Sequence, residues 1–400
     1  MTTTSSDGLR ATVVLAGLHG HGRSHLAAVE ALSRRSGIRL AGVCDPVPPS
    51  AEDAARLRDV VVTTRLDDLL DEVRPDVTII CTPIHTHAEL ARQALARGSH
   101  LLLEKPPTPT YDDFEALLAD VDASGLTCQV GFQSLGSPAV DRIRELVRSG
   151  AVGEVVGIGA EGAWVRERAY YDRGRWAGRR SLDGVPVVDG VLTNPLAHSV
   201  SAALRIDGSE TPDAVRDVAV ELYRAHDIEA DDTSCLRLRT RRGTVITVAA
   251  TLCATRTHEP VVTVHGTRGR IALAYKRGEV RVRTDDRAEE VQVSTHPPVP
   301  LLENLVAHLH DPSVELLVPL RSTAGFMRVL DAVRCAPDPT PIPPEHWTAH
   351  GSGPAERRVV HGVDEAVTEA ARRLRLFSEL GVPWAAGAMS TVSAGEELGS

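Results

Sequence analysis

The chain has 400 residues, of which 42% are hydrophobic and 24% charged, a composition typical of globular proteins with sizeable cores. A formal net charge of −10, with no block rich in Lys and Arg, argues against nucleic acid or an anionic membrane surface as a partner. Because a single core seldom grows beyond about 250–300 residues, we expect two domains.

No apolar run approaches the roughly 20 residues that span a bilayer. Residues 1–10 lack the basic and apolar pattern of a signal peptide, and we expect them to form a disordered lead-in. Six cysteines are scattered with no CxxC pair, which is the pattern of reduced thiols in a cytoplasmic protein.

Residues 11–133 alternate short apolar runs with longer amphipathic ones. Strands are predicted at 11–17, 38–45, 77–82, 100–106 and 126–132, and helices at 25–35, 87–98 and 110–125. Continuous apolar strands separated by amphipathic helices indicate a parallel sheet covered on both faces. The first part of the chain is therefore predicted to be a doubly wound α/β nucleotide-binding domain.

A glycine-rich turn follows the first predicted strand, in the stretch AGLHGHGRSH (16–25). Such a turn lets backbone N–H groups approach a pyrophosphate at the positive end of a helix. Gly17 and Gly22 hold the outer positions of a G-x-G-x-x-G pattern, Gly20 adds flexibility, and His19 stands where the second glycine belongs. The pattern predicts dinucleotide binding, although a plain tight turn would also explain the glycines.

Later strand ends support the same interpretation. Asp45 ends the second strand, 28 residues after Gly17. Its carboxylate can accept hydrogen bonds from the ribose hydroxyls of a dinucleotide. The same negative charge would repel a 2′-phosphate, which favours NAD over NADP. In a doubly wound sheet ligands lie across the carboxyl ends of the strands. The remaining cofactor candidates follow two further strands, in CTPIHTH (81–87) and LLLEKPP (101–107): Thr82, Pro83, His87, Glu104 and Lys105.

Several histidines are expected to gather at this edge of the sheet, namely His19, His21, His25, His85 and His87. No Asp, Glu or Cys accompanies them at the spacing of metal ligands, and the cofactor would occupy the space. We therefore predict no metal site.

The pattern changes in residues 134–385, where strands follow one another closely. They are predicted at 152–165, 215–225, 233–240, 243–254, 260–266, 269–275 and 279–284. Alternating apolar and polar residues indicate an α+β domain with a large, mostly antiparallel sheet. Helices at 142–150 and 194–204 are expected to cover one face, and the other, open face is expected to pack on a second subunit in a homodimer or homotetramer. A last helix is predicted at 363–381, and 386–400 is expected to be a flexible tail.

The order of these motifs resembles the Gfo/Idh/MocA family, which includes glucose–fructose oxidoreductase and inositol dehydrogenase. The resemblance is carried by G-x-x-G-x-G-R-x-H, C-D-P, C-T-P-x-x-x-H-A-E-L-A-x-x-A-L-x-x-G and E-K-P. It implies an NAD(P)-binding Rossmann domain and hydride transfer at a hydroxyl-bearing carbon of a sugar or cyclic polyol. It also places Lys105 near the nicotinamide and the reacting oxygen, where an ammonium can stabilise oxyanion character or relay a proton. Glu104 would hold Lys105 or tune its pKa, although a surface Glu–Lys pair is the plain alternative.

Members of the family usually carry an Asp four residues before a His on one helix. In VDGVLTNPLAH (188–198), Asn194 and His198 have this spacing, which puts two side chains on one helix face. Asn can bind a substrate hydroxyl but cannot take its proton. His198 is then the expected base, and Asp189 is a second candidate for the missing carboxylate, while a capping Asn and a core His remain the alternative.

The segment 162–180 is dense in Arg and aromatic residues. Arg166 and Trp176 are candidates for binding a polyhydroxylated or acidic substrate, and a packing or oligomer loop is the alternative. The leading prediction is an NAD-dependent dehydrogenase of a sugar, inositol or related polyol. An NAD-retaining glycoside hydrolase or lyase of the same family, and a non-catalytic NAD-binding regulator, remain open.

Overall fold

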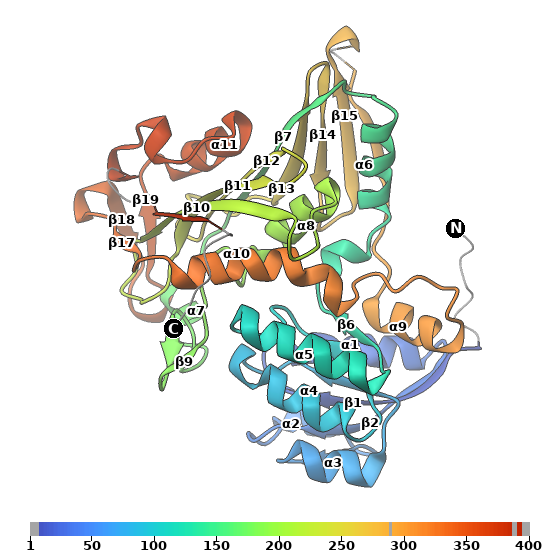
Figure 1. Cartoon of the computed structure of the whole chain (residues 1–400). Coiled ribbons are helices and arrows are strands. Elements are labelled where there is room, and N and C mark those ends of the chain that lie inside the picture. Colours follow the sequence, from blue (N-terminus) through green and yellow to red (C-terminus); the bar gives the residue numbers. More distant parts are fainter. Residues whose placement is uncertain (1–7, 288–289, 386–389, 394–400) are drawn as a thin grey trace. The chain divides into compact units, whose positions relative to one another are not determined.

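The chain divides into two units, one formed by 1–132 with 299–321 and the other by 133–298 with 322–400. The computed structural model, drawn in Figure 1, describes residues 8–287, 290–385 and 390–393. None of the helices in this described part of the chain has the length and apolar character that crossing a membrane requires.

The first unit contains a parallel sheet, as the apolar runs predicted, with six strands in the order β3-β2-β1-β4-β5-β6, of which β3 was not predicted. The order reverses between β1 and β4, and this reversal is where doubly wound sheets bind ligands. All four residues of β4 are buried, because helices cover both faces of the sheet. The strands are β1 Arg10–Ala16, β2 Gly37–Cys44, β3 Val61–Thr63, β4 Val77–Ile80, β5 His100–Leu103 and β6 Cys128–Val130.

Five α-helices connect these strands: α1 Gly22–Ser33, α2 Ala51–Arg56, α3 Leu66–Val73, α4 His87–Leu95 and α5 Tyr111–Ser124. The sequence explains several of their ends. Ser50 and Thr110 cap α2 and α5 by accepting hydrogen bonds from backbone N–H groups (both 3.1 Å). Gly125, at φ +67°, ends α5 in the left-handed conformation that glycine adopts most easily.

Residues 299–321, expected in the second domain, belong to the first unit. They contain helix α9, Leu301–His310. The buried side chain of Gln129 holds residues 299–321 on the first unit, because it donates to Leu301 O (2.5 Å) and accepts from Val318 N (3.0 Å). A long-range pairing of this kind leaves no periodic signal in the sequence.

The second unit contains the large sheet, in the order β16-β15-β14-β13-β7-β12-β11-β10-β17, with β20 also paired to β10. Most neighbours are antiparallel, as predicted, but β7–β12 and β10–β17 are parallel pairs. The strands are β7 Val155–Ala163, β10 Val215–Arg224, β11 Thr233–Thr240, β12 Val245–Thr251, β13 Val261–Gly266, β14 Gly269–Ala274, β15 Glu279–Thr284, β16 Gln292–Thr295, β17 Thr340–Pro341 and β20 Ser390–Ser393.

Among its described residues, the second unit also contains two short hairpins and five α-helices. The hairpins pair β8 (Ser181–Leu182) with β9 (Val185–Pro186) and β18 (Trp347–His350) with β19 (Arg357–Val360). The helices are α6 Ala139–Arg148, α7 Arg168–Tyr171, α8 Ala197–Asp207, α10 Ala324–Cys335 and α11 Val363–Arg373.

The sheet face that was expected to be open is covered in part by α11. Successive residues of a strand point to opposite faces. On β7, a side chain at Gly162 would collide with Leu196, which directly precedes α8, whereas one at Gly159 would lie 2.0 Å from Ala371 O of α11. Helices α8 and α11 therefore pack on opposite faces, and β7 and β12 are covered on both sides (Figure 1).

Two further expectations at the C-terminal end are wrong. The predicted helix 363–381 ends at Arg373, because Leu374 takes a left-handed conformation (φ +55°). Part of the predicted tail, Ser390–Ser393, forms β20 and extends the sheet beside β10; residues 386–389 and 394–400 lie outside the described residues. Tyr223, Phe377 and Trp384 form a buried aromatic core where this end packs on the sheet.

Candidate functional site

The glycine turn after β1 has a shape that only glycine allows at two positions. Gly17 has φ +90°, and a Cβ there would lie 2.2 Å from Cys81 O. A Cβ at Gly22 would lie 2.0 Å from Gly17 O, inside the turn itself. Backbone can thus approach a ligand closely at the start of α1, which is the requirement for holding a pyrophosphate. The residues present fit a dinucleotide.

Asp45 follows β2 and supports the glycine turn. One carboxylate oxygen accepts a hydrogen bond from Leu18 N (2.8 Å) and the other from Val47 N (2.9 Å). A carboxylate offers about four acceptor positions, so two remain for ribose hydroxyls. His19, in the place of the second glycine, lies beside the same group, with Nε2 4.0 Å from Asp45 Oδ1 and 3.3 Å from Val47 O.

Thr82, Pro83 and His87 build the next loop of this edge. The Thr82 and Thr86 hydroxyls are hydrogen-bonded (2.7 Å), and Thr86 donates to Pro83 O (2.8 Å). The His87 ring is buried, with its two nitrogens 2.9 Å from Thr82 O and Pro106 O. Burial lowers the pKa of His87, and the ring lies between this loop and the turn after β5, close to a carbonyl oxygen of each.

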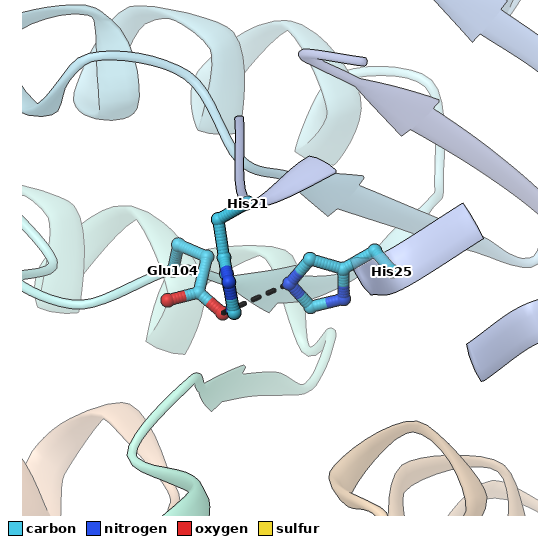
Figure 2. A group of neighbouring side chains, drawn as sticks. All are labelled: His21, His25 and Glu104. Atoms are coloured by element: carbon cyan, nitrogen blue, oxygen red, sulfur yellow. Dashed lines mark hydrogen bonds and ion pairs between the residues drawn. The ribbon is translucent and has the colours of Figure 1, made fainter. Parts of the chain in front are cut away.

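Glu104, directly after β5, is buried, and His21 and His25 of the α1 region both lie close to one of its carboxylate oxygens (Figure 2). His25 donates to Glu104 Oε1 (2.9 Å), and His21 Nε2 lies 3.5 Å from the same oxygen. The expectation that no carboxylate accompanies these histidines is therefore wrong. Chain separation explains the error, since His25 and Glu104 are 79 positions apart.

The charges in this cluster reinforce one another. Burial alone would raise the pKa of Glu104, but hydrogen bonds and charge from His21 and His25 hold it well below its usual range. The hydrogen bond to Glu104 raises the pKa of His21 in return. Glu104 is thus an anion, and its second oxygen accepts from the backbone N–H of Lys105 (3.1 Å). The cluster fixes the backbone from which the half-buried Lys105 side chain extends.

In the second unit, Asn194 and Asp189 lie together. Asn194 donates to Asp189 Oδ1 (2.5 Å), and the buried Asp189 also accepts from Arg173 Nη2 (2.7 Å) and Gly178 N (2.7 Å). Burial raises the pKa of Asp189 despite the neighbouring Arg173. Because Asp189 engages the amide nitrogen of Asn194, the orientation of that amide is fixed.

Asn194 and His198 do not share a helix, contrary to expectation. Helix α8 begins at Ala197, and Asn194 lies in the preceding turn, where its N–H donates to Gly190 O (3.0 Å). Pro195 explains the difference, because a residue before proline avoids the helical conformation. His198 lies in the first turn of α8 and forms a hydrogen bond through Nδ1 with the Ser134 hydroxyl (3.0 Å), a partner that no sequence signal indicated.

The Arg and aromatic residues of 162–180 stack largely on one another. The Arg166 guanidinium lies 4.8 Å from the Trp164 ring centre and 5.0 Å from that of Tyr170. Arg173 lies 3.7 Å from the Tyr170 ring centre and 4.4 Å from that of Trp176. These contacts favour a packed loop around Asp189, with Arg173 as the connection that the sequence did not reveal.

Comparisons with known proteins agree with this arrangement. Residues 11–132 match the family model described as "Oxidoreductase family, NAD-binding Rossmann fold", and residues 140–272 match the GFO/IDH/MocA C-terminal domain. Inositol 2-dehydrogenase of Rhizobium meliloti (strain 1021) is 25% identical over 68% of this chain and 78% of its own. Levoglucosan dehydrogenase of Pseudarthrobacter phenanthrenivorans is 26% identical over 57% of this chain and 63% of its own.

A solved structure with a similar fold is the WlbA dehydrogenase from Bordetella pertussis in complex with NADH and UDP-GlcNAcA. Its TM-score is 0.66 at 22% identity, and the similarity covers 81% of this chain and 95% of that one. At this identity the likeness shows the fold. The matches to both family domains, in order along one chain with the glycine turn and strand ends described above, show that the protein is an NAD-binding oxidoreductase of the GFO/IDH/MocA family.

Proposed function

We propose that the protein is a dehydrogenase that transfers a hydride between NAD and a hydroxyl-bearing carbon of a sugar, inositol or related polyol. The observation that carries the proposal is the fixed position of Lys105, whose backbone N–H is held by an ionised, buried Glu104 at the carboxyl edge of the parallel sheet. NAD, when bound, supplies the hydride acceptor or donor. The glycine turn and Asp45 would hold it.

Lys105 would act on the reacting oxygen. An ammonium group stabilises the negative charge that develops on that oxygen and can pass on its proton. Glu104 does not need to touch substrate for this role. Glu104 anchors the backbone of Lys105, and His21 and His25 stabilise the negative charge of Glu104.

His198 is the proposed base and Asn194 the residue that positions the hydroxyl. The hydrogen bond with the Ser134 hydroxyl positions the His198 ring, and an imidazole is suited to accept a proton near neutral pH. Asp189 accepts a hydrogen bond from the amide nitrogen of Asn194 and so orients an amide that would hydrogen-bond a substrate hydroxyl. Arg166 and Trp176 remain candidates for contacts with the rest of the substrate.

The substrate class rests on the printed names of relatives, which include an inositol dehydrogenase and a levoglucosan dehydrogenase. Asp45 supports a preference for NAD over NADP, because its carboxylate would repel a 2′-phosphate.

We also propose a cytoplasmic homodimer or homotetramer. All six cysteines are free thiols, which fits a reducing compartment. The interface is proposed on the sheet around β14 and β15, away from the strands that α11 covers.

The test is Lys105→Met. We expect turnover to fall by at least about a hundredfold, the usual scale for an electrostatic or acid–base group, while calorimetry shows that NAD still binds. Near-normal turnover in this variant would refute the role of Lys105. A second titration of the wild-type chain with NADP should give weaker binding than NAD, and equal or tighter NADP binding would refute the role of Asp45.

A further inference from the structure

Two basic side chains of the second unit contact one aromatic ring. The indole of Trp164, the residue after β7, is buried, and its Nε1 donates to His258 O (3.2 Å). The Arg166 guanidinium lies 4.8 Å from the centre of this indole ring. Lys276 Nζ, from the turn between β14 and β15, lies 4.1 Å from the same centre. Two segments that are far apart in the sequence thus bring two cations together.

Neither of these two cations forms an ion pair with a carboxylate within residues 8–287, 290–385 and 390–393. Arg166 Nη1 donates to a neutral acceptor, Val165 O (3.1 Å). The charge of Glu259 acts on Lys276, but the Glu259 carboxylate is ion-paired with Arg277 (3.0 Å). The described part of the protein therefore leaves a local excess of positive charge beside Trp164.

The two positive charges act on each other. Burial lowers the pKa of Lys276, and the charge of Arg166 lowers it further. The cation–π contacts attract each cation to the Trp164 ring, but they do not remove the repulsion between the cations. A negatively charged group beside both would be attracted by both. Lys276 is exposed, so a ligand can reach it from solvent.

Arg166 adjoins the turn that holds Asn194. Its guanidinium lies 5.0 Å from the Tyr170 ring centre, and that of Arg173 lies 3.7 Å from the same ring centre. Arg173 in turn donates to Asp189, the carboxylate that orients the Asn194 amide. Two side chains, Tyr170 and Arg173, therefore connect Arg166 to the Asp189–Asn194 pair.

Lys276 adjoins the helix that carries His198. Tyr275 directly precedes Lys276, and its ring centre lies 6.0 Å from that of His198. The Tyr275 hydroxyl is also 3.2 Å from Ser199 Oγ of α8. All of these residues belong to the second unit. The two cations thus lie close to both residues that are proposed to act on the substrate hydroxyl.

We propose that the substrate carries an anionic group, a carboxylate or a phosphate, and that Arg166 and Lys276 bind it. The proposal rests on the proposed function, since it takes the second unit to hold the sugar or polyol that is oxidised. The oxygens of either group accept hydrogen bonds from a guanidinium and an ammonium, and the fork of Arg166 matches their geometry. The substrate is then a sugar acid or a sugar phosphate and not a neutral polyol.

The test compares D-glucose, D-glucuronate and D-glucose 6-phosphate, which share a sugar ring and differ in the group at C6. Their binding to the full chain is measured by calorimetry with saturating NADH, which cannot accept a hydride from them. We expect at least one anionic probe to bind about tenfold or more tightly than D-glucose, because hydrogen bonds between charged groups are the stronger ones. This preference should shrink as NaCl is raised, because salt screens exposed charges.

Lys276→Met should weaken binding of the preferred anionic probe about tenfold and leave binding of D-glucose unchanged. Arg166→Gln should have the same effect, and the exposed position of Lys276 keeps the test valid if Arg166→Gln does not fold. Arg175→Gln is the matched control. It removes the same charge from an exposed arginine that is paired with Asp183 (3.2 Å), and it should bind all probes like wild type.

Three results would overturn the proposal. One is that neither anionic probe binds the wild-type chain more tightly than D-glucose does. Another is that the preference for the anionic probe persists in Lys276→Met. The third is displacement of that probe by inorganic phosphate at equal or lower concentration, which would show an adventitious anion site. Failure of the proposed function is distinguishable, because NADH would then not form from NAD while the binding preference for the anionic probe remained.

Discussion

Glu104 is a buried anion that two histidines stabilise, and its charge state makes the stability of the first unit depend on pH. A carboxylate with a depressed pKa contributes stability that is fully present above its usual pKa of about 4.3 and is lost as pH falls through the folded-state value. Glu104→Gln should therefore lower the free energy of unfolding by about 2–3 kcal/mol near pH 6, less than a fully buried pair because His21 is half-exposed.

The measurement is urea unfolding of both proteins at about pH 6 and about pH 3, where the difference should shrink. The difference in unfolding free energy between the two proteins should also decline as pH rises above 6 and through the raised pKa of His21. Glu115→Gln, at an exposed position of α5, serves as the control and should change stability by under about 0.5 kcal/mol. A difference for Glu104→Gln that is the same at both pH values would contradict this account.

His198 and Asn194 should differ in kinetic effect. His198→Ala removes the proposed base and should depress kcat strongly, together with the acidic limb of the pH profile of kcat/KM. Asn194→Ala removes a neutral amide and should raise KM more than it lowers kcat. Asn194→Asp should shift the acidic limb to higher pH, since a nearby carboxylate favours the imidazolium.

The measurement is kcat/KM against pH for the three variants on one substrate. An acidic limb that persists in His198→Ala would exclude His198 as the base and make Lys105 or Asp189 the better candidate.

Among the elements, the glycine turn after β1 allows a sharp comparison. Gly17→Ala combines a left-handed backbone angle with a clash against Cys81 O, whereas Gly98→Ala, at φ +76°, meets no atom within 4 Å. Gly98→Ala should cost about 1 kcal/mol for its backbone conformation alone. Gly17→Ala should cost clearly more and should abolish NAD binding. Unfolding and calorimetry of both variants check this, and equal stability losses would show that the turn can open.

The return of 299–321 to the first unit rests largely on Gln129. Gln129→Ala removes the hydrogen bonds to Leu301 O and Val318 N and leaves the Val318 N–H without this partner, and we expect a loss of about 1–3 kcal/mol in urea unfolding. Gln93→Ala, on the surface of α4, should cost under about 0.5 kcal/mol. If Gln129→Ala is as mild as the control, other contacts hold the segment.

These elements show what the sequence could predict. Most strands of both sheets follow from apolar runs and alternation, whereas the short strands β3, β16, β17 and β20 were not predicted. The carboxyl edge follows because parallel strands end together. The helix predicted at 194–204 begins only at Ala197, because Pro195 disfavours a helical conformation at Asn194. The helix predicted at 363–381 ends before Leu374, although the amphipathic pattern continues beyond it. The cluster of His21, His25 and Glu104 and the pair of His198 and Ser134 depend on tertiary contacts, which periodicity does not encode.

At the scale of the whole molecule, the two units contribute different residues to the proposed reaction. In the proposed function the first would supply the glycine turn, Asp45 and Lys105, and its match to the NAD-binding family model spans residues 11–132. The second would supply Asn194 and His198.

The most direct test of the account is the balance between NADH formed and substrate consumed. The wild-type chain is incubated with NAD and a panel of sugars, inositols and their acids, and NADH absorbance is compared with product analysis. We predict that at least one compound is oxidised with one NADH released per molecule. Products without net NADH would identify an NAD-retaining hydrolase or lyase, and no turnover of any compound despite bound NAD would identify a regulator; either result would contradict the dehydrogenase proposed here.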